Sequence, residues 1–259
     1  MEESSITIST PGVIFATFFE TLLPFVLAFI WIRKNNGKIR YILIGIGGFI
    51  GSVLIESIFI SLITKKFGKD SSILVLITGI SPGLFEETGK YLLIKCIYSQ
   101  EKIKNNSISY GIGHGGIESF MIGMSLLANI FAKDALIENG ALKKSISFSF
   151  CLMSAFERLF AITLQISLSI LNYKAIKDKK IIFYFYAIIL HDLIDLFAIL
   201  YQKGILESIY VVELIIGLLS FSIFYYAYNL YINLDEKEKE KEKSIPLEDK
   251  KESSINKID

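Results

Sequence analysis

The sequence predicts an all-α protein, a polytopic bundle of about seven transmembrane helices with the N-terminus outside and the C-terminus inside. Of its 259 residues, 52% are hydrophobic and 20% are charged, and the mean hydropathy of +0.51 is high for a soluble domain. The charged residues lie in short runs between long apolar stretches and in the C-terminal tail, which is typical of a multi-pass membrane protein.

Each apolar stretch is at least about 20 residues long, enough for a helix to cross a hydrocarbon core of roughly 30 Å. The stretches run near residues 11–32, 41–64, 72–97, 107–132, 145–172, 181–202 and 206–232. We expect residues 1–234 to form one membrane-embedded domain. From Asp235 onward acidic and basic residues alternate, so residues 235–259 are predicted to be a solvated helix or, more simply, a disordered cytoplasmic tail.

The loops between these stretches alternate in basicity. The more basic set contains Arg33, Lys34, Lys38, Arg40, Lys102, Lys104, Lys174, Lys177, Lys179 and Lys180, and the tail adds further lysines to it. The opposite loops carry Lys65, Lys66, Lys69, Lys133, Lys143, Lys144 and Lys203. By the positive-inside rule the first set lies in the cytoplasm. We expect a plasma membrane protein of a bacterium, since abundant Ile, Lys and Asn are associated with AT-rich bacterial genomes.

Charge and cysteine content exclude several classes of partner and site. The net charge of +1 gives no reason to expect a nucleic acid partner. Cys96 and Cys151 lie in separate apolar stretches without a CxxC pattern, so neither a disulfide framework nor a thiolate zinc site is indicated. The acidic N-terminus lacks the basic region of a secretory signal, and we therefore expect the first span to be retained.

The third stretch contains two adjacent carboxylates and a lysine, Glu86, Glu87 and Lys90. An ionisable residue at the bilayer centre costs about 2.5–3.5 kcal/mol on insertion scales, which favours a functional role for three of them within five residues. On a helix Lys90 can reach either acid, so a buried salt bridge between helices explains it equally well. The preceding Ser81-Pro82-Gly83 predicts a break at which the helix is capped and restarted.

Both histidines of the chain fall inside predicted spans, and each is followed four residues later by an acid. His114 pairs with Glu118, and His191 pairs with Asp195 on the same helix face. Counted from the cytoplasmic ends, all four lie roughly 10–20 Å deep, at a depth similar to that of the two adjacent glutamates. Three helices therefore deliver carboxylates and imidazoles to one layer, open towards the cytoplasmic half.

Hydrolysis by an activated water is the chemistry that these groups indicate. One carboxylate can act as a general base towards water and another can donate a proton to the leaving amine. The imidazoles can bind a divalent metal such as zinc together with a carboxylate, or stabilise a developing oxyanion. No motif for a serine or cysteine nucleophile is present.

Some other residues at this depth have two readings. Glu157 and Arg158 in the fifth stretch either close the site or neutralise each other as a structural pair. The glycines around His114 permit the close approach of a neighbouring helix or of a substrate backbone. These glycines are Gly111, Gly113, Gly115 and Gly116. Glu20, Glu56 and Glu213 have no same-helix partner and are treated as background.

Taken together, the motifs resemble the YhfC family of intramembrane metalloproteases and, more distantly, the PrsW-type and CAAX-type membrane proteases. The resemblance rests on Glu86-Glu87-Thr-Gly-Lys90, His114-Gly-Gly-Ile-Glu118 and His191-Asp-Leu-Ile-Asp195, and runs from the third to the sixth span. The EExxK spacing is that of the PrsW branch, whereas CAAX-type enzymes have EExxxR. Residues 1–234 would then be a protease-like domain.

The resemblance implies an intramembrane endopeptidase that acts on membrane-associated peptides or proteins. Glu86 or Glu87 would activate the water, while His114, Glu118, His191 and Asp195 would shape the site through metal ligation or oxyanion stabilisation. Lys90, Glu157 and Arg158 would support it. A zinc ion would be held by His114, His191 and Glu118, although the HxxxE and HxxxD pairs depart from HExxH, and the choice between the two glutamates stays open.

Two readings from other classes compete with the protease. Carboxylate and imidazole relays also mark the ion pathways of proton- or cation-coupled transporters, but the sequence lacks the paired halves that many of them show. A non-catalytic membrane scaffold or immunity protein could retain the same helices. Substrate-dependent ion flux would indicate the transporter, and a partner complex unaffected by glutamate substitution would indicate the scaffold.

Overall fold

The computed structural model describes residues 6–68, 72–101, 104–140, 142, 145–202 and 204–244. These residues form α1 (Thr10–Asn35), α2 (Ile39–Phe67), α3 (Ser72–Gln100), α4 (Asn105–Phe131), α5 (Lys133–Glu138), α6 (Phe148–Lys177), α7 (Ile182–Gln202) and α8 (Ile209–Ser244). No strand occurs within these ranges, where the only β pairing is an isolated bridge between Ile8 and Ile146. The prediction of an all-α protein is confirmed.

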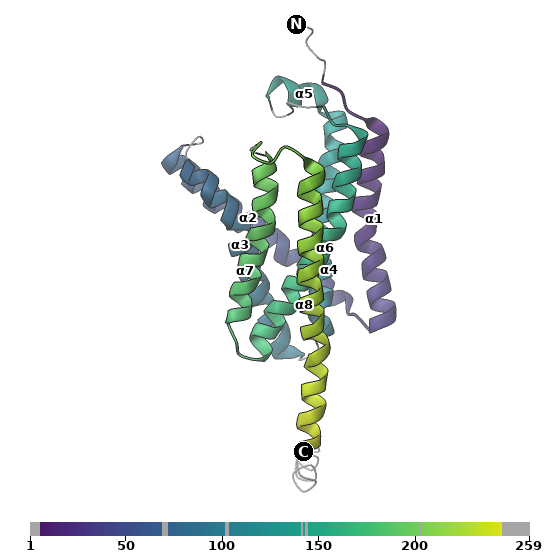
Figure 1. The fold of residues 1–259 in the computed structure, drawn as a ribbon, viewed down its shortest axis with the longest axis vertical. Helices are drawn as coiled ribbons and strands as arrows, with labels where there is room; N and C mark the ends of the chain where they lie inside the picture. Colours follow the sequence, from purple (N-terminus) through teal and green to yellow (C-terminus); the bar gives the residue numbers. More distant parts are fainter. Residues whose placement is uncertain are drawn as a thin grey trace.

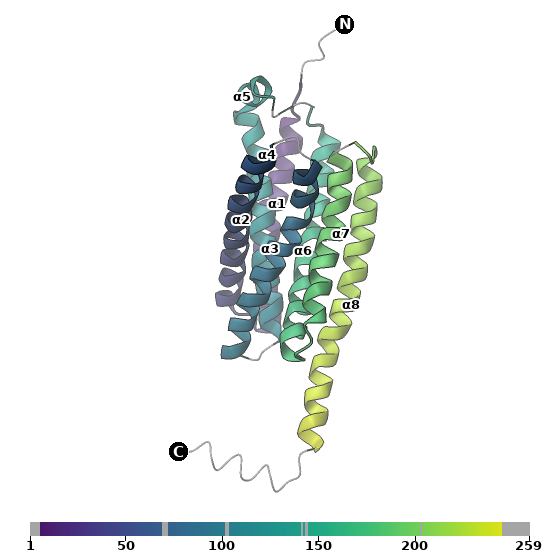
Figure 2. The same cartoon turned by 90° about the vertical axis from the view of Figure 1, so that its left-hand side faces the viewer.

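The long helices run alongside one another (Figure 1), with the N-terminus and α5 at one end and the last turns of α8 extending beyond the other. Among the five most apolar helices, α6 is the most enclosed. In its apolar stretch 67% of the residues are buried, against 17–28% in the four other apolar helices, α1, α2, α7 and α8. Figure 2 shows α6 lying between the helices that carry the polar motifs. Its leucines form a core with α7 and α8, namely Leu164, Leu168, Leu171, Ala187, Ile194, Val212, Ile216 and Ile223.

Five helices are long and apolar enough to cross a membrane: α1, α2, α6, α7 and the part of α8 that ends at Leu234. Their outer surfaces carry large exposed hydrophobic side chains. On α1, Phe18, Phe25 and Phe29 are 60–65% exposed, which suits contact with lipid tails. The chain is therefore a membrane protein. The predicted third and fourth spans correspond to α3 and α4, which have 29 and 27 residues but a more polar composition.

Several predicted boundaries differ from the structure. The fifth span starts and ends later than predicted. Helix α6 starts at Phe148, where the Ser147 side chain caps it, and continues to Lys177. Helix α5 was not predicted. Helix α8 continues through Ser244, ten residues into the predicted tail, while residues 245–259 lie outside the described part, as do Lys69, Lys102, Lys143, Lys144 and Lys203.

Helix α3 is continuous through Pro82, so the predicted break there is wrong. A proline lacks the N–H group that would bond the preceding turn. The next N–H group, that of Gly83, donates to Asp192 Oδ1 on α7 at 3.0 Å. A Cβ at Gly83 would overlap that carboxylate. The proline therefore marks a close contact between α3 and α7, one turn before Glu86.

Candidate functional site

The structure brings the three sequence motifs together in the middle of the bundle. Glu86 and Glu87 come from α3, His114 from α4 and His191 from α7. The Nε2 atom of His114 lies 2.9 Å from Glu86 Oε2, and the Nδ1 atom of His191 lies 2.9 Å from Glu87 Oε1. All four side chains are at most 9% exposed. Each glutamate thus has its own histidine, from a different helix.

Glu87 is surrounded by hydrogen-bond donors. Its Oε1 atom accepts from Lys90 Nζ at 2.5 Å as well as from His191, and its Oε2 atom accepts from Asn172 Nδ2 at 2.7 Å. The Glu87 and Lys90 side chains are both 0% exposed. An ionised carboxylate only accepts hydrogen bonds, so His191 donates from Nδ1 and its Nε2 atom is left for other partners. Glu87 therefore orients its neighbours.

Glu86 has fewer and longer contacts. Apart from His114, its Oε2 atom lies 3.5 Å from Gln165 Nε2 and 4.0 Å from His191 Nε2. The ring of His114 is held between Phe49 and Tyr110, with centroid distances of 5.2 and 5.8 Å. Of the two adjacent glutamates, Glu86 is therefore the less tightly held.

The remaining acids of the motifs, Glu118 and Asp195, line one small cavity together with His191. Asp195 Oδ2 is 3.7 Å from His191 Nε2, and its side chain is 32% exposed. Glu118 Oε1 accepts from Arg158 Nη1 at 3.0 Å. Arg158 also contacts the adjacent Glu157. Its guanidinium therefore pairs with both carboxylates, which is compatible with both readings of the Glu157–Arg158 pair.

Close helix packing around His114 depends on glycine. A Cβ at Gly113 would overlap the carbonyl oxygen of Ile42 on α2, and a Cβ at Gly111 would lie 2.6 Å from Ile166 Cα on α6. No real side chain tolerates such contacts without moving the helices apart. These glycines therefore serve a neighbouring helix at these two positions, one of the two readings that the sequence allowed.

A cavity of about 70 Å³ adjoins the site. It is lined by Glu118, Glu157, Arg158, Ala161, Leu164, Gln165, His191, Ile194, Asp195 and Ile216. Glu86 Oε2 lies behind two of these, Gln165 and His191, at the distances given above. The volume holds a few water molecules but no peptide.

A larger cavity of about 290 Å³ shares Glu157, Arg158 and Ile216 with the smaller one. It extends to Phe150 near the start of α6, Tyr201 near the end of α7 and residues at the start of α8. These helix ends lie on the side of the bundle that carries the chain N-terminus (Figure 2). The expectation that the site opens towards the basic, C-terminal side is therefore not met by these cavities.

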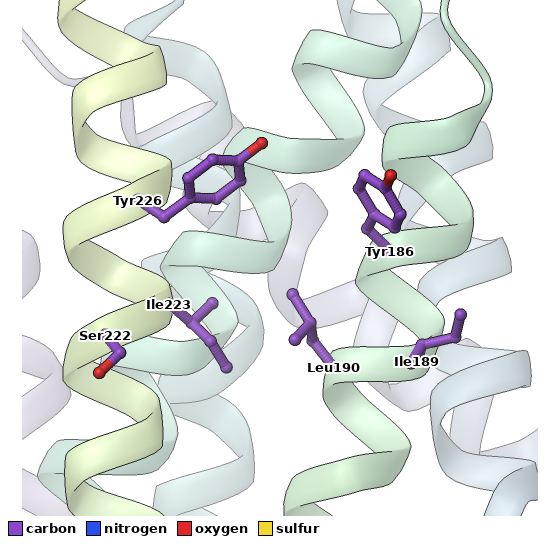
Figure 3. A pocket seen from close by; sticks show the side chains of 6 residues that line it. All are labelled: Tyr186, Ile189, Leu190, Ser222, Ile223 and Tyr226. Atoms are coloured by element: carbon purple, nitrogen blue, oxygen red, sulfur yellow. The ribbon is translucent and has the colours of Figure 1, made fainter.

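A third cavity, of about 370 Å³, lies away from the motifs between α7 and α8. Figure 3 shows Leu190 and Ile223 facing each other across it, below the two rings Tyr186 and Tyr226. Its lining contains no acid, imidazole or amine. This groove offers apolar contact but none of the groups needed for hydrolysis.

Sequence reasoning missed several polar residues of the site. Gln165 and Asn172 come from α6, and Asp192 from α7 accepts the Gly83 N–H group. The two amides were overlooked because an uncharged side chain is less conspicuous in an apolar stretch than a charge. Their signal was the spacing: Arg158, Gln165 and Asn172 recur every seven residues.

The residues do not fit a metal in the arrangement seen. Within the described ranges no three His, Cys, Asp or Glu side chains converge as a metal-binding group. The predicted ligands His114, His191 and Glu118 each face a different partner, respectively Glu86, Glu87 and Arg158. A metal ligand set needs at least three donors about 2 Å from one point. The zinc prediction thus has no support from this geometry.

Comparison with known proteins gives two matches. The sequence model of a family described as YhfC intramembrane metalloprotease matches residues 19–216. The uncharacterized membrane protein YhfC of Bacillus subtilis (strain 168) is 32% identical over 158 residues, which are 53% of this chain and 61% of that relative. The chain thus spans less than two thirds of the relative's length. No solved structure matches the chain.

Proposed function

This chain belongs to the YhfC family, and from that membership we propose that it is an intramembrane endopeptidase, which hydrolyses peptide bonds of membrane-associated substrates. The observation that supports this most is the pairing of each glutamate with a histidine from another helix, beside a polar cavity in the middle of the bundle. Buried carboxylates and imidazoles are costly in a membrane and are kept where they act.

In this mechanism Glu86 is the general base. A water molecule in the polar cavity would attack the carbonyl carbon of the scissile bond while Glu86 takes its proton. Glu86 would then give that proton to the leaving nitrogen as the C–N bond breaks, which yields a carboxylate and an amine. Glu86 suits this role because its carboxylate, unlike that of Glu87, does not accept from Lys90, and its amide contact, with Gln165, is long at 3.5 Å.

The other motif residues would hold the water and the developing charge. His191 Nε2 lies between Glu86 Oε2 at 4.0 Å and Asp195 Oδ2 at 3.7 Å. Both gaps exceed a direct hydrogen bond and match groups that share a bound water. The Arg158 guanidinium lines the same cavity and supplies a donor for the oxyanion. No step is assigned to a metal, although the family is named for one.

We further propose seven spans with the N-terminus outside. At 1.5 Å per residue, α3 and α4 are about 44 and 40 Å long, enough to cross the membrane. These two helices are less apolar than the other five because they contain charged and polar residues of the site. The basic loop residues lie at the end of the bundle from which α8 extends, so by the positive-inside rule that end is cytoplasmic. The polar cavities then open to the outer side of a bacterial plasma membrane.

Peptide cleavage by the purified protein in proteoliposomes tests the proposal. The wild-type chain, Glu86→Gln and the control Glu20→Gln would each be given a panel of membrane-anchored peptides, with products identified by mass spectrometry. Glu20 is also fully buried, but its carboxylate accepts from Ser154 outside the site. We expect Glu86→Gln to lose cleavage by about a hundred- to ten-thousand-fold and Glu20→Gln to keep it. Equal cleavage by all three would refute the mechanism.

A further inference from the structure

Helix α6 carries a row of polar side chains that no sequence motif of the site includes. Arg158, Gln165 and Asn172 are only 4%, 3% and 0% exposed. Seven residues make about 1.9 helical turns, so the three lie on one face of α6, roughly 10 Å apart along its axis. This face borders α3, α4 and α7, the three helices that carry the motifs.

Each side chain of the row contacts a charged residue of the motifs. Arg158 donates to Glu118 at 3.0 Å. Gln165 accepts from Lys90 Nζ at 2.6 Å through Oε1, and its Nε2 atom donates to Glu118 Oε2 at 3.1 Å. Asn172 donates to Glu87 Oε2 at 2.7 Å. A lysine can only donate and an ionised carboxylate can only accept, so the partners themselves fix which way the two amides point.

We propose that Gln165 and Asn172 are positioning residues of this site, which act by holding Glu87 and Lys90 so that His191 presents Nε2 to Glu86 and Asp195. The expected effect on catalysis rests on the proposed function, whereas the positioning of Glu87, Lys90 and His191 depends on the fold alone. Neither amide needs to touch a substrate.

For Asn172 the chain of contacts is short. Its Nδ2 atom is anchored to the carbonyl oxygen of Leu168 on its own helix at 3.0 Å while it donates to Glu87. Glu87 is thereby held in one orientation, with its other oxygen facing His191 Nδ1 at 2.9 Å. Nδ1 then carries a proton, which leaves Nε2 as the ring atom that faces Glu86 and Asp195. Removing the amide would free Glu87 to rotate and His191 to change its hydrogen bonds.

Gln165 acts from the other side of the ion pair. Its carbonyl oxygen gives Lys90 a second buried acceptor besides Glu87, and its NH₂ group lies between the carboxylates of Glu86 and Glu118. Without that amide, the two carboxylates would face each other with no donor between them. We therefore expect Gln165 to hold Glu86 apart from Glu118 and towards His114.

A simpler explanation is that the two amides serve only as hydrogen-bond partners for the buried Lys90 and Glu87, since most buried polar groups have such partners. On that reading their loss lowers stability but leaves the state of His191 unchanged in the molecules that fold. The state of His191 therefore separates positioning from packing. The chain is suited to this test because it contains only two histidines.

The experiment is a nitrogen NMR spectrum of the full-length protein in detergent with isotope-labelled histidine. The signals are assigned with His114→Gln, and the spectrum is compared among wild type, Asn172→Leu, Asn172→Ser and Gln165→Met. The control is Asn129→Leu, an amide that bonds only carbonyl groups of its own helix. Asn172→Ser keeps a small polar group that is too short to reach Glu87, in case the leucine variant does not fold.

We expect wild type and the control to show one His191 state, with the Nδ1 proton bonded to Glu87, and the Asn172 variants to show a changed or mixed His191 spectrum. Folded Asn172 variants whose His191 spectrum equals that of wild type would overturn the proposal. In a cleavage assay, the two amide variants should lose kcat by roughly 10–100-fold, as expected for groups that orient a catalytic residue, with KM within about twofold. If no peptide is cleaved even by wild type, the proposed function fails, and the NMR result still decides this inference.

Discussion

The proposed roles of Glu86 and Glu87 predict that substitutions of the two residues affect stability and activity differently. Glu87 and Lys90 form a fully buried pair with 2.5 Å between Nζ and Oε1. Removing one partner of such a pair costs about 3–5 kcal/mol, because the other charge stays buried without compensation. In Glu87→Gln the new amide would also point its NH₂ group at donors, namely Lys90, Asn172 or His191. Glu86→Gln keeps an acceptor for His114 and should cost only about 1 kcal/mol.

Chemical denaturation in detergent, followed for both variants and the wild type, measures these differences. The control is the double variant Glu87→Gln/Lys90→Met, which removes both charges and should recover a large part of the lost stability. The reasoning is refuted if Glu86→Gln and Glu87→Gln are destabilised equally, or if the double variant is no more stable than Glu87→Gln alone. Glu86→Gln should be well folded and inactive.

Three further predictions follow from packing, access and ligand geometry. Gly113→Ala should lower the free energy of unfolding by about 1–3 kcal/mol because its Cβ would overlap the Ile42 carbonyl. Gly51→Ala, with no atom within 4 Å, should cost nothing, and equal effects would contradict the packing. In a background without native cysteines, Ser154→Cys in the larger cavity should react with an impermeant thiol reagent applied outside intact cells. Labelling of inverted vesicles but not of intact cells would contradict the proposed orientation. A chelator should leave cleavage within about twofold, and its loss together with about one bound metal per chain would contradict the ligand geometry.

The sequence was sufficient to predict the helices and the meeting of the three motifs. A spacing of four residues places His114 near Glu118 and His191 near Asp195. The similar depth of the motifs in their spans places them in one layer of the membrane. It could not separate Glu86 from Glu87. Adjacent residues on a helix point about 100° apart, and which direction faces Lys90 and which faces the cavity depends on how α3 packs against its neighbours.

The contribution of α6 was harder to predict. Gln165 and Asn172 carry no charge, and in a single sequence a buried amide is as compatible with packing as with a site. The contacts of Gln165 with Lys90 and of Asn172 with Glu87 show that residues spaced by seven on α6 face the site. The predicted metal ligands do not converge in the structure for a related reason. A shared helix face allows Glu118 to approach His114, but Glu118 pairs with Arg158 on α6.

Hydrolysis in water enriched in the heavy oxygen isotope tests the central claim most directly. Wild-type protein in proteoliposomes would be incubated with a membrane-anchored peptide, and the new C-terminal carboxylate would be analysed by mass spectrometry. The account predicts one heavy oxygen per cleaved bond with wild-type protein and no product above background with Glu86→Gln. Undiminished cleavage by the folded Glu86→Gln variant, or a product without heavy oxygen, would contradict a water activated by Glu86.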